Sequence, residues 1–353
     1  MHLRSLVLQH FRSYTQKRFD FFPDMTIVVG PNTAGKTNLI ESIILLSTGK
    51  SFRAEKDMHM IAFGQDVSHV QGLVEENGGK VKLAITLAQG EATGGRFVKK
   101  FLVNDVPKSR NHFVGHLPAV LFRPEELDII VDGPGLRRSF LDSILEQIDN
   151  DYQTVKLVYD KALRQRNALL DLVKETGRRS IEQFAYWDEL LISNGQIITA
   201  KREELIQTIN LAPKDIFSFS MYYDKSIMSK ERLLQYADAE IGAGMTLVGP
   251  QRDDFYCTMP TSAGEQNVQE FGSRGQQRLV ILQLKLMHVM LVEERIGTKP
   301  LLVLDDIFSE LDSGHIRLVL EKVKGSQIIL TTTHKEFIDT ANFQSFDMIE
   351  LKK

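Results

Sequence analysis

The sequence is poor in cysteine and in long apolar runs, and each shortage excludes a class of protein. The one cysteine, Cys257, excludes an internal disulfide and any zinc site built from cysteines, which fits a reducing compartment. No run of about 18 apolar residues is present, so no membrane-spanning helix is predicted. The first residues are too polar to resemble a signal peptide. We therefore expect a cytoplasmic protein with no membrane partner.

The sequence also lacks an excess of either charge and any internal repeat. Its 43 Lys and Arg residues against 46 Asp and Glu residues give a net charge of −3, so contact with nucleic acid would require a local basic patch. No repeat or low-complexity run is visible. Apolar residues make up 42% of the 353 residues, which is enough for about two domains with buried cores.

The most informative stretch lies near the N-terminus, where an apolar run ends at Gly30. The pattern Gly30-x-x-x-x-Gly35-Lys36-Thr37 follows, and the next residues have helical spacing. A buried strand, a glycine-rich loop and a helix start in that order form a phosphate-binding loop (P-loop). Lys36 would reach the β- and γ-phosphates of a nucleoside triphosphate, and the Thr37 hydroxyl would hold Mg²⁺. The predicted nucleotide-binding residues are Gly30, Pro31, Asn32, Thr33, Ala34, Gly35, Lys36, Thr37 and Asn38.

A second group of motifs lies near the C-terminus. Ser273-Arg274-Gly275-Gln276 precedes an apolar helical pattern, and Ser and Gly at a helix start favour an anion site. An apolar strand over 301–304 leads into Asp305, which this position would place beside the P-loop, where it would hold Mg²⁺ through water. Another apolar strand ends at His334. Each motif is weak alone, and their order and spacing behind a P-loop make the combination specific.

The segments between these motifs predict the domain organisation. Alternating residues over 67–75, 81–87 and 97–103 are separated by two turns, which contain Gly78-Gly79 and Gly94-Gly95, and predict an antiparallel β-meander. Helical spacing over 139–212, interrupted near Gly177, predicts a long helical hairpin. The predicted domains are an N-terminal ATPase part (1–138), an inserted helical lobe (139–244) and a C-terminal ATPase part (245–353).

Three arginines have more than one interpretation. Arg12 lies in a polar-aromatic turn and would either contact nucleotide phosphate or lie on the surface. Arg137 and Arg138 follow a Gly-Pro-Gly loop and would either form a solvated face or bind phosphate or a partner carboxylate. Position in the sequence does not decide between these interpretations.

Taken together, the motifs resemble the heads of ATP-binding-cassette proteins. The P-loop, signature, Walker B strand, D-loop and switch histidine of such heads correspond to Gly30–Thr37, Ser273–Gln276, Leu301–Asp306, Ser309–Asp312 and His334. Within that superfamily the chain is similar, nearly end to end, to the RecF family of bacterial recombination-mediator ATPases. The motifs that carry this similarity are Phe11–Tyr14, Gly35–Leu39 with Glu41, Gly49–Arg53, Gly133–Asp142, Gly249–Asp254, Ser273–Gln276, Leu304–Asp306 and Glu310–Asp312.

The resemblance implies an α/β fold, namely an ABC-type P-loop ATPase head with a mixed sheet, an antiparallel β-subdomain and an inserted α-helical lobe. It implies an ATP-dependent homodimer, with ATP and Mg²⁺ as cofactors, in which the signature of one head closes on the γ-phosphate held by the other. Such a dimer would bind double-stranded DNA at gaps or junctions. It would act with RecR and RecO to help load RecA in gap repair, replication restart and the SOS response.

The resemblance also suggests roles for individual residues. Asp306 would activate the attacking water, His334 would contact the γ-phosphate, and Lys36 would act with them in catalysis. Because most cassette ATPases carry the longer Glu at the position of Asp306, we expect slow hydrolysis, stimulated by DNA. The remaining residues expected to contact nucleotide are Arg12, Ser273, Arg274, Gly275 and Gln276.

Two positions depart from the family pattern. Thr33 stands where a P-loop Gly is usual, and its Cβ lies where the backbone approaches phosphate, so nucleotide affinity would be altered. Gln251 stands where a His is common before Arg-Asp-Asp.

Three other functions use the same P-loop. A defence or signalling ATPase would act with a nuclease, expected in trans because the chain ends at Lys353, straight after the last predicted sheet segments. An ATP-gated clamp with vestigial hydrolysis is disfavoured by the presence of Asp305, Asp306 and His334. A metabolic P-loop kinase is the weakest alternative, because it would have no use for the signature and the D-loop.

Overall fold

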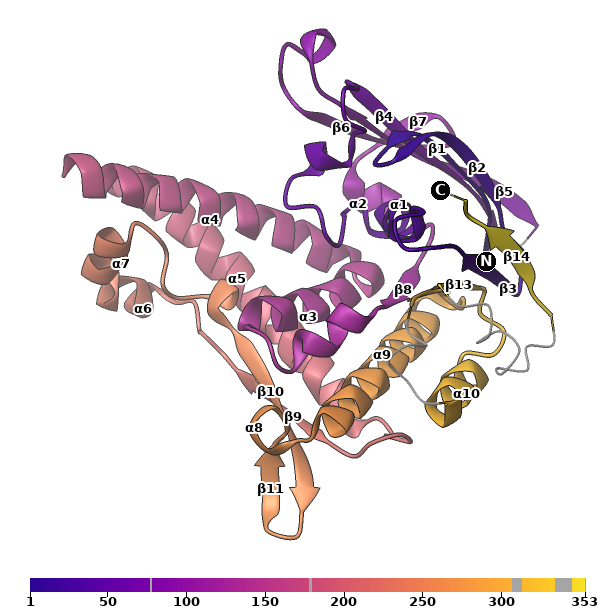
Figure 1. Ribbon diagram of the computed structural model, residues 1–353. Coiled ribbons are helices and arrows are strands. Elements are labelled where there is room, and N and C mark those ends of the chain that lie inside the picture. The colour runs from indigo at the N-terminus through magenta and orange to yellow at the C-terminus, as the bar shows by residue number, and fades with distance from the viewer. Residues whose placement is uncertain (77, 178–179, 307–312, 334–344, 353) are drawn as a thin grey trace. The chain divides into compact units, whose positions relative to one another are not determined.

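The computed structural model describes residues 1–76, 78–177, 180–306, 313–333 and 345–352 (Figure 1). The chain forms two compact units. Unit one combines Met1–Glu126 with His288–Lys353, and unit two is the continuous segment Leu127–Met287. These limits differ from the predicted domain limits, since residues on both sides of the predicted 139–244 lobe belong to unit two.

Unit one contains two sheets. In the antiparallel sheet the strand order is β2-β1-β4-β5-β6-β7, and the predicted meander is confirmed as β4, β5 and β6. In the parallel sheet the order is β14-β3-β13-β12-β8. The strands of the first sheet are β1 His2–Phe11, β2 Tyr14–Asp20, β4 Val67–Glu76, β5 Gly79–Ala88, β6 Val98–Val103 and β7 Val106–Lys108. Those of the second are β3 Met25–Val29, β8 Ala119–Phe122, β12 Leu301–Asp305, β13 Ile328–Thr332 and β14 Asp347–Glu350.

The α/β fold class is confirmed, with one difference of arrangement. Parallel and antiparallel pairs lie in separate sheets rather than in one mixed sheet. Every residue of β3, β12 and β13 is buried, as expected for central strands of a parallel sheet covered on both faces. The shorter helical elements of unit one are η1 Asp57–Met60, η2 Glu91–Thr93, α2 Arg110–Phe113 and α10 Ser313–Lys322, and η3 Pro124–Ile129 crosses into unit two.

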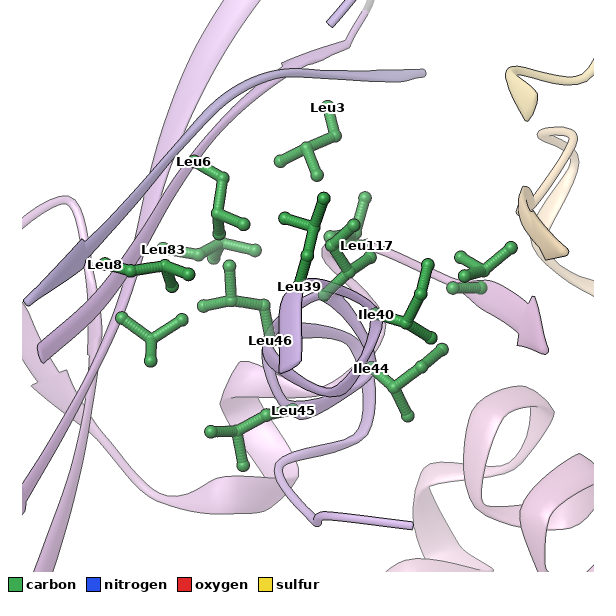
Figure 2. Packing of buried hydrophobic residues seen from close by; sticks show 14 of the residues in the cluster. Leu3, Leu6, Leu8, Leu39, Ile40, Ile44, Leu45, Leu46, Leu83 and Leu117 are labelled. Atoms are coloured by element: carbon green, nitrogen blue, oxygen red, sulfur yellow. The ribbon is translucent and has the colours of Figure 1, made fainter. Parts of the chain in front are cut away.

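Helix α1 (Lys36–Thr48) lies between the two sheets of unit one. It contacts β1, β4 and β5 of the antiparallel sheet and β8 and β12 of the parallel sheet. Figure 2 shows Leu46 on the side of Leu6, whereas Ile40 and Ile44 lie on the opposite side of the helix. A helix that is buried on all sides needs apolar residues on all sides, which is why this segment is not amphipathic.

A buried glutamine joins the two sheets of unit one. The Gln327 side-chain oxygen accepts a hydrogen bond of 2.7 Å from the Leu3 amide on β1. Its Nε2 donates to the carbonyls of Leu3 and Phe22, both at 2.9 Å. Phe22 precedes β3 and Gln327 precedes β13, so one amide fixes β1 relative to the start of the parallel sheet. Only 2% of Gln327 is exposed, so water does not replace these bonds.

Unit two is built on the predicted helical hairpin, which is confirmed as α4 (Asn150–Thr176) and α5 (Ile181–Leu211). Asp149 and Ser180 cap the two helix starts, and α5 ends before Pro213. A three-stranded antiparallel sheet in the order β11-β10-β9 completes the unit with shorter helices. The remaining elements are α3 Pro134–Ile148, β9 Ser220–Asp224, α6 Lys230–Gln235, α7 Ala237–Ala243, η4 Pro250–Arg252, β10 Asp254–Thr261, β11 Gly264–Asn267, α8 Val268–Phe271 and the first part of α9 Arg274–Ile296.

Buried ion pairs explain why α3 and β10 belong with the hairpin. Arg202 on α5 donates to the carboxylates of Asp142 on α3 (2.9 Å) and Asp253 next to β10 (3.1 Å). Arg137 donates to both carboxylate oxygens of Asp254, at 2.6 and 2.9 Å, and Arg138 to the Asp253 carbonyl at 2.7 Å. Arg137 and Arg138 therefore bind acceptors of their own chain. The solvated-face interpretation is wrong for Arg137, which is 6% exposed.

None of the helices within the described ranges combines the length and the apolar character that crossing a membrane requires.

The Gln327 amide predicts a stability effect far from any proposed ligand. Gln327→Ala removes the side-chain partner of the buried Leu3 amide and carbonyl and of the part-buried Phe22 carbonyl, so we expect the free energy of unfolding to fall by about 3 kcal/mol. Urea denaturation followed by circular dichroism measures the change. Gln16→Ala on the exposed part of β2 is the control and should change stability by less than about 0.5 kcal/mol. A change at Gln327 as small as the control would contradict the bridging role.

Candidate nucleotide-binding site

The P-loop connects the buried strand β3 to the buried helix α1. The Lys36 ammonium donates hydrogen bonds to the carbonyl oxygens of Gly30 (2.7 Å) and Pro31 (3.1 Å), so the side chain folds along the loop. Lys36 is 8% exposed. Burial lowers its pKa, and the nearby carboxylates of Asp306 and Asp305 oppose that shift. A buried ammonium held against the loop carbonyls is poised to exchange them for phosphate oxygens.

Two residues of the loop have left-handed backbone angles. Gly35, just before α1, has φ 98°, and a Cβ there would lie 2.7 Å from the Tyr14 hydroxyl oxygen, so a glycine is required. That hydroxyl donates to the Gly35 carbonyl at 3.1 Å. Thr33 has φ 72°, which is costly for a β-branched side chain. The departure from the family pattern at Thr33 therefore coincides with backbone strain.

The two acidic residues after β12 lie at the same edge of the parallel sheet as the P-loop. β13 pairs with both β3 and β12, which brings Asp305 opposite Thr331 and Thr332 opposite Val29. Thr331 donates to the Asp305 carboxylate at 2.5 Å and so orients it. The Asp306 amide in turn donates to the Thr331 carbonyl at 3.2 Å. The sheet register thus confirms the predicted placement of Asp305 beside the loop.

The Asp305 carboxylate is buried among other acids. Burial raises its pKa, and the charges of Glu125 and Asp306 add to the shift, while the Thr331 hydroxyl and Lys36 lower it. A cation bound there would remove this penalty.

The oxygen donors at this site suit a hydrated Mg²⁺ ion that is shared with phosphate better than a metal ion held by protein ligands alone. The described residues contain no group of three or more His, Cys, Asp or Glu side chains that would hold a metal ion. The Asp305 carboxylate, with the predicted ligand Thr37 as a second oxygen donor, would suit a cation that keeps several waters and shares phosphate oxygens. The residues present therefore fit a magnesium ion bound together with a nucleotide.

A buried carboxylate organises the basic side chains around α1. Glu41 is fully buried and accepts two hydrogen bonds from Arg12 (2.8 and 2.6 Å), one from Ser51 (2.6 Å) and one from Arg53 (2.9 Å). Burial alone would raise the pKa of Glu41, but the bonds from Arg12 and Ser51 and the charges of both arginines hold it below its usual value. Arg12 also donates to the His59 carbonyl at 2.6 Å. Arg12 therefore lies beside the P-loop helix rather than free on the surface, and its contact with nucleotide stays a prediction.

The predicted signature lies in unit two, where it forms a capped helix start. The Ser273 amide donates to the Gln276 side-chain oxygen at 2.8 Å, and the Gln276 amide donates to the Ser273 hydroxyl at 3.2 Å. This reciprocal pair is a capping box at the start of α9. Ser273, Arg274 and Gly275 are exposed, so the helix start is open to an anion. The pattern Ser-x-Gly-Gln thus has a structural role at the helix start, and its contact with nucleotide stays a prediction.

His334 and the D-loop Ser309–Asp312 lie outside the described residues.

Sequence reasoning gave no role to three residues that shape the site. Tyr14 packs against Gly35, Thr331 orients Asp305, and Glu125 raises the pKa of that carboxyl. Two polar residues at the carboxyl end of a buried strand that begins with three apolar residues were the available signal for Thr331. The neighbours of Tyr14 and Glu125 depend on how distant segments pack, which local patterns do not encode.

Comparison with known proteins places these features in a family. Residues 2–351 match the family model described as RecF/RecN/SMC N terminal domain. The chain is 33% identical over 380 residues to the DNA replication and repair protein RecF of Cyanothece sp., which covers 99% of this chain and 96% of the relative. It is 34% identical over 365 residues to the RecF of Moorella thermoacetica, covering 99% and 95%.

Solved structures show the same fold. The structure of the recombination mediator protein RecF-ATPrS in the RecFOR pathway superimposes with a TM-score of 0.85 at 28% identity, covering 99% of this chain and 96% of that one. The structure of RecF-ATP in the RecFOR pathway gives a TM-score of 0.82 at 30% identity, covering 94% and 92%. An SmcHead bound to the C-winged helix domain of ScpA gives 0.50 at 16% identity, which shows likeness of fold alone.

The strain at Thr33 predicts a stabilising substitution. Thr33→Gly removes a β-branched side chain from a left-handed backbone, so we expect the free energy of unfolding to rise by about 0.5–1 kcal/mol. The control, Thr15→Gly on exposed β2, should have the opposite sign and a similar size, since glycine weakens a strand. Chemical denaturation without nucleotide compares the two. Destabilisation by Thr33→Gly would mean that the strain is absent in solution.

The Glu41 cluster predicts a pH-dependent effect. Glu41→Gln leaves two arginines without their buried partner, so we expect stability at neutral pH to fall by about 3 kcal/mol. The folded-state pKa of Glu41 lies below the ordinary 4.5, so its contribution is complete above pH 4.5 and is lost as the pH falls through the folded-state pKa. The difference between wild type and variant should therefore shrink in acid. The exposed control, Glu55→Gln, should change stability by less than about 0.5 kcal/mol. A loss of stability in Glu41→Gln that does not vary with pH would contradict the ion-pair explanation.

Proposed function

The chain belongs to the RecF/RecN/SMC family, within which it is a member of the RecF group, and on that premise we propose that it is an ATP-driven recombination mediator. Two copies would close on two ATP molecules, bind double-stranded DNA at gaps or junctions, and help load RecA together with RecO and RecR. Replication restart and the SOS response would depend on the same activity, and the protein would act in the cytoplasm. RecF structures at 28% and 30% identity in the RecFOR pathway support this proposal.

One observation carries the ATP-binding part of the proposal. Lys36 lies at the start of α1, and its charge interacts with those of Asp305 and Asp306 at the end of β12. All three residues belong to unit one, although 269 positions separate Lys36 from Asp305 in the chain. A P-loop lysine next to a Walker B acid is the minimum arrangement for binding a nucleoside triphosphate with Mg²⁺. The likeness to RecF structures with bound ATP agrees with it.

Four residues of unit one would have separate roles in binding and hydrolysing ATP. Lys36 releases the Gly30 and Pro31 carbonyls and binds the β- and γ-phosphates, and the amides of the loop close on the same oxygens. Thr37 and Asp305 would hold Mg²⁺, which neutralises charge on the phosphates. Asp306 would accept a proton from the attacking water. Because Asp has one methylene fewer than Glu, it reaches less far, and hydrolysis would be slow and dependent on DNA for stimulation.

The signature would complete the nucleotide site of a second copy. The capping box leaves Ser273 and Gly275 exposed at the positive end of α9, and a γ-phosphate held by the other copy would bind there. Arg274 adds a positive charge beside it. ATP would therefore act as a bridge that holds two heads together, and hydrolysis would release them.

The proposal predicts how the mass of the protein responds to ATP. Light scattering should show a doubling of mass when ATP and Mg²⁺ are added, and gapped duplex DNA should bind the ATP-bound dimer better than the ATP-free protein. DNA affinity should fall steeply with salt, because contacts to phosphates dominate it.

Two matched variants separate dimerisation from nucleotide binding. Ser273→Arg should bind a fluorescent ATP analogue as well as wild type does but remain a monomer, because the larger side chain fills the anion site. Ser262→Arg makes the same change in the exposed turn between β10 and β11 and should dimerise normally. A mass that never responds to ATP would refute the composite site. Dimerisation without DNA binding would favour a defence or signalling ATPase instead.

A further inference from the structure

The start of α9 is tied to the short helix before it. The Val268 carbonyl on α8 accepts hydrogen bonds from the Gly272 amide (3.0 Å) and from the Gln277 side chain (3.2 Å). The Gln277 side chain also lies 3.3 Å from the Gln269 carbonyl. A Cβ at Gly272 would lie 2.4 Å from the Val268 carbonyl oxygen, so the close turn requires glycine. These contacts join α8 and the signature turn, which together are called the signature piece (268–277).

A glutamine side chain anchors that piece to a distant segment of unit two. Asn267 caps α8 by accepting from the Gln269 amide at 2.8 Å. The Gln269 side chain then donates to the Val131 carbonyl at 3.0 Å. Val131 belongs to the segment 129–132, which precedes α3, so this bond spans 138 positions of sequence. It ties the signature piece to a part of unit two that lies far before it in sequence.

Arg137 holds the segment that Gln269 contacts. Its Nη1 lies within hydrogen-bond distance of the carbonyls of Ile129 (3.2 Å), Ile130 (3.4 Å) and Asp132 (2.5 Å). Its Nε and Nη2 donate to the carboxylate of Asp254, the first residue of β10, at 2.6 and 2.9 Å. The four consecutive carbonyls of the segment 129–132 therefore all accept from side chains. Three of them accept from Arg137 and one accepts from Gln269. β10 continues through β11 into α8, so the contacts form a closed circuit within unit two.

We propose that Arg137 and Gln269 are positioning residues for the signature, fixing the start of α9 through the segment 129–132. In this proposed role, neither side chain touches the nucleotide held by the second copy. Their effect is to hold the amides and the Ser273 hydroxyl in the orientation in which a second copy's phosphate meets them. A planar guanidinium that binds a carboxylate and a row of carbonyls at once has no equivalent in lysine, so the charge alone does not suffice. The consequence for dimerisation depends on the proposed function, whereas the anchoring itself does not.

The test compares two identical substitutions three residues apart. Gln269→Met removes the donor to Val131 and keeps the side-chain length, and Gln266→Met on β11 is the matched control. Hydrogen exchange of a peptide covering 268–277, measured without nucleotide, should become about five- to tenfold faster in Gln269→Met and stay unchanged in the control. In the same preparations, ATP-driven dimerisation should weaken about 25-fold, because each of two composite sites loses about fivefold.

A second variant separates charge from geometry. Arg137→Lys keeps the positive charge but loses the bidentate and carbonyl contacts, so it should also speed exchange over 268–277, with thermal unfolding as the check that unit two remains folded. Unchanged exchange in both variants would overturn the anchoring. Faster exchange with normal ATP-driven dimerisation would overturn the positioning role. If wild type itself fails to dimerise with ATP, the proposed function fails, and the exchange result still supports or overturns the anchoring.

Discussion

The burial of α1 on two opposite sides is the constraint on which unit one depends. A helix packed between an antiparallel and a parallel sheet cannot tilt without disturbing both cores, since close-packed interiors do not deform continuously. The P-loop is therefore held at both of its ends, by buried β3 and by buried α1. The same burial requires that the one carboxylate on the helix, Glu41, find partners, and Arg12, Ser51 and Arg53 supply them.

Both units use motif arginines to hold their own backbone and carboxylates. Arg12 and Arg53 bind Glu41 in unit one, and Arg138 binds the Asp253 carbonyl in unit two. Outside the family positions of unit two, Arg137 and Arg202 are almost completely buried, and each joins elements that are far apart in sequence. Buried ion pairs add little net stability, but breaking one leaves an uncompensated charge, so such pairs select one arrangement of elements over others. Residues that identify the family by resemblance can therefore have a structural role, and a match to a motif does not by itself mark a ligand contact.

Local patterns were sufficient to predict most elements and part of the site. The alternation of β4 to β6, the long helices α4 and α5, and the loop before Lys36 follow from periodicity and glycine placement. The position of Asp305 beside the loop followed from the rule that parallel strands present their carboxyl ends at one edge. The limits of unit two did not follow, because they depend on ion pairs such as Arg137 with Asp254, whose partners are 117 positions apart. The burial of Glu41 was likewise invisible, since a carboxylate on a helix is usually read as exposed.

The strand order of the parallel sheet also bears on how the protein is made. β3, which carries the P-loop, lies between β13 and β14, and both of these neighbours come from the last part of the chain. During synthesis on the ribosome, β3 has neither of its two neighbours in the sheet until Ile328–Thr332 has been translated. Unit two is continuous, and all its residues emerge before those two strands. The nascent chain would thus expose an unpaired apolar strand while the whole of unit two is made, and such a strand is prone to aggregation.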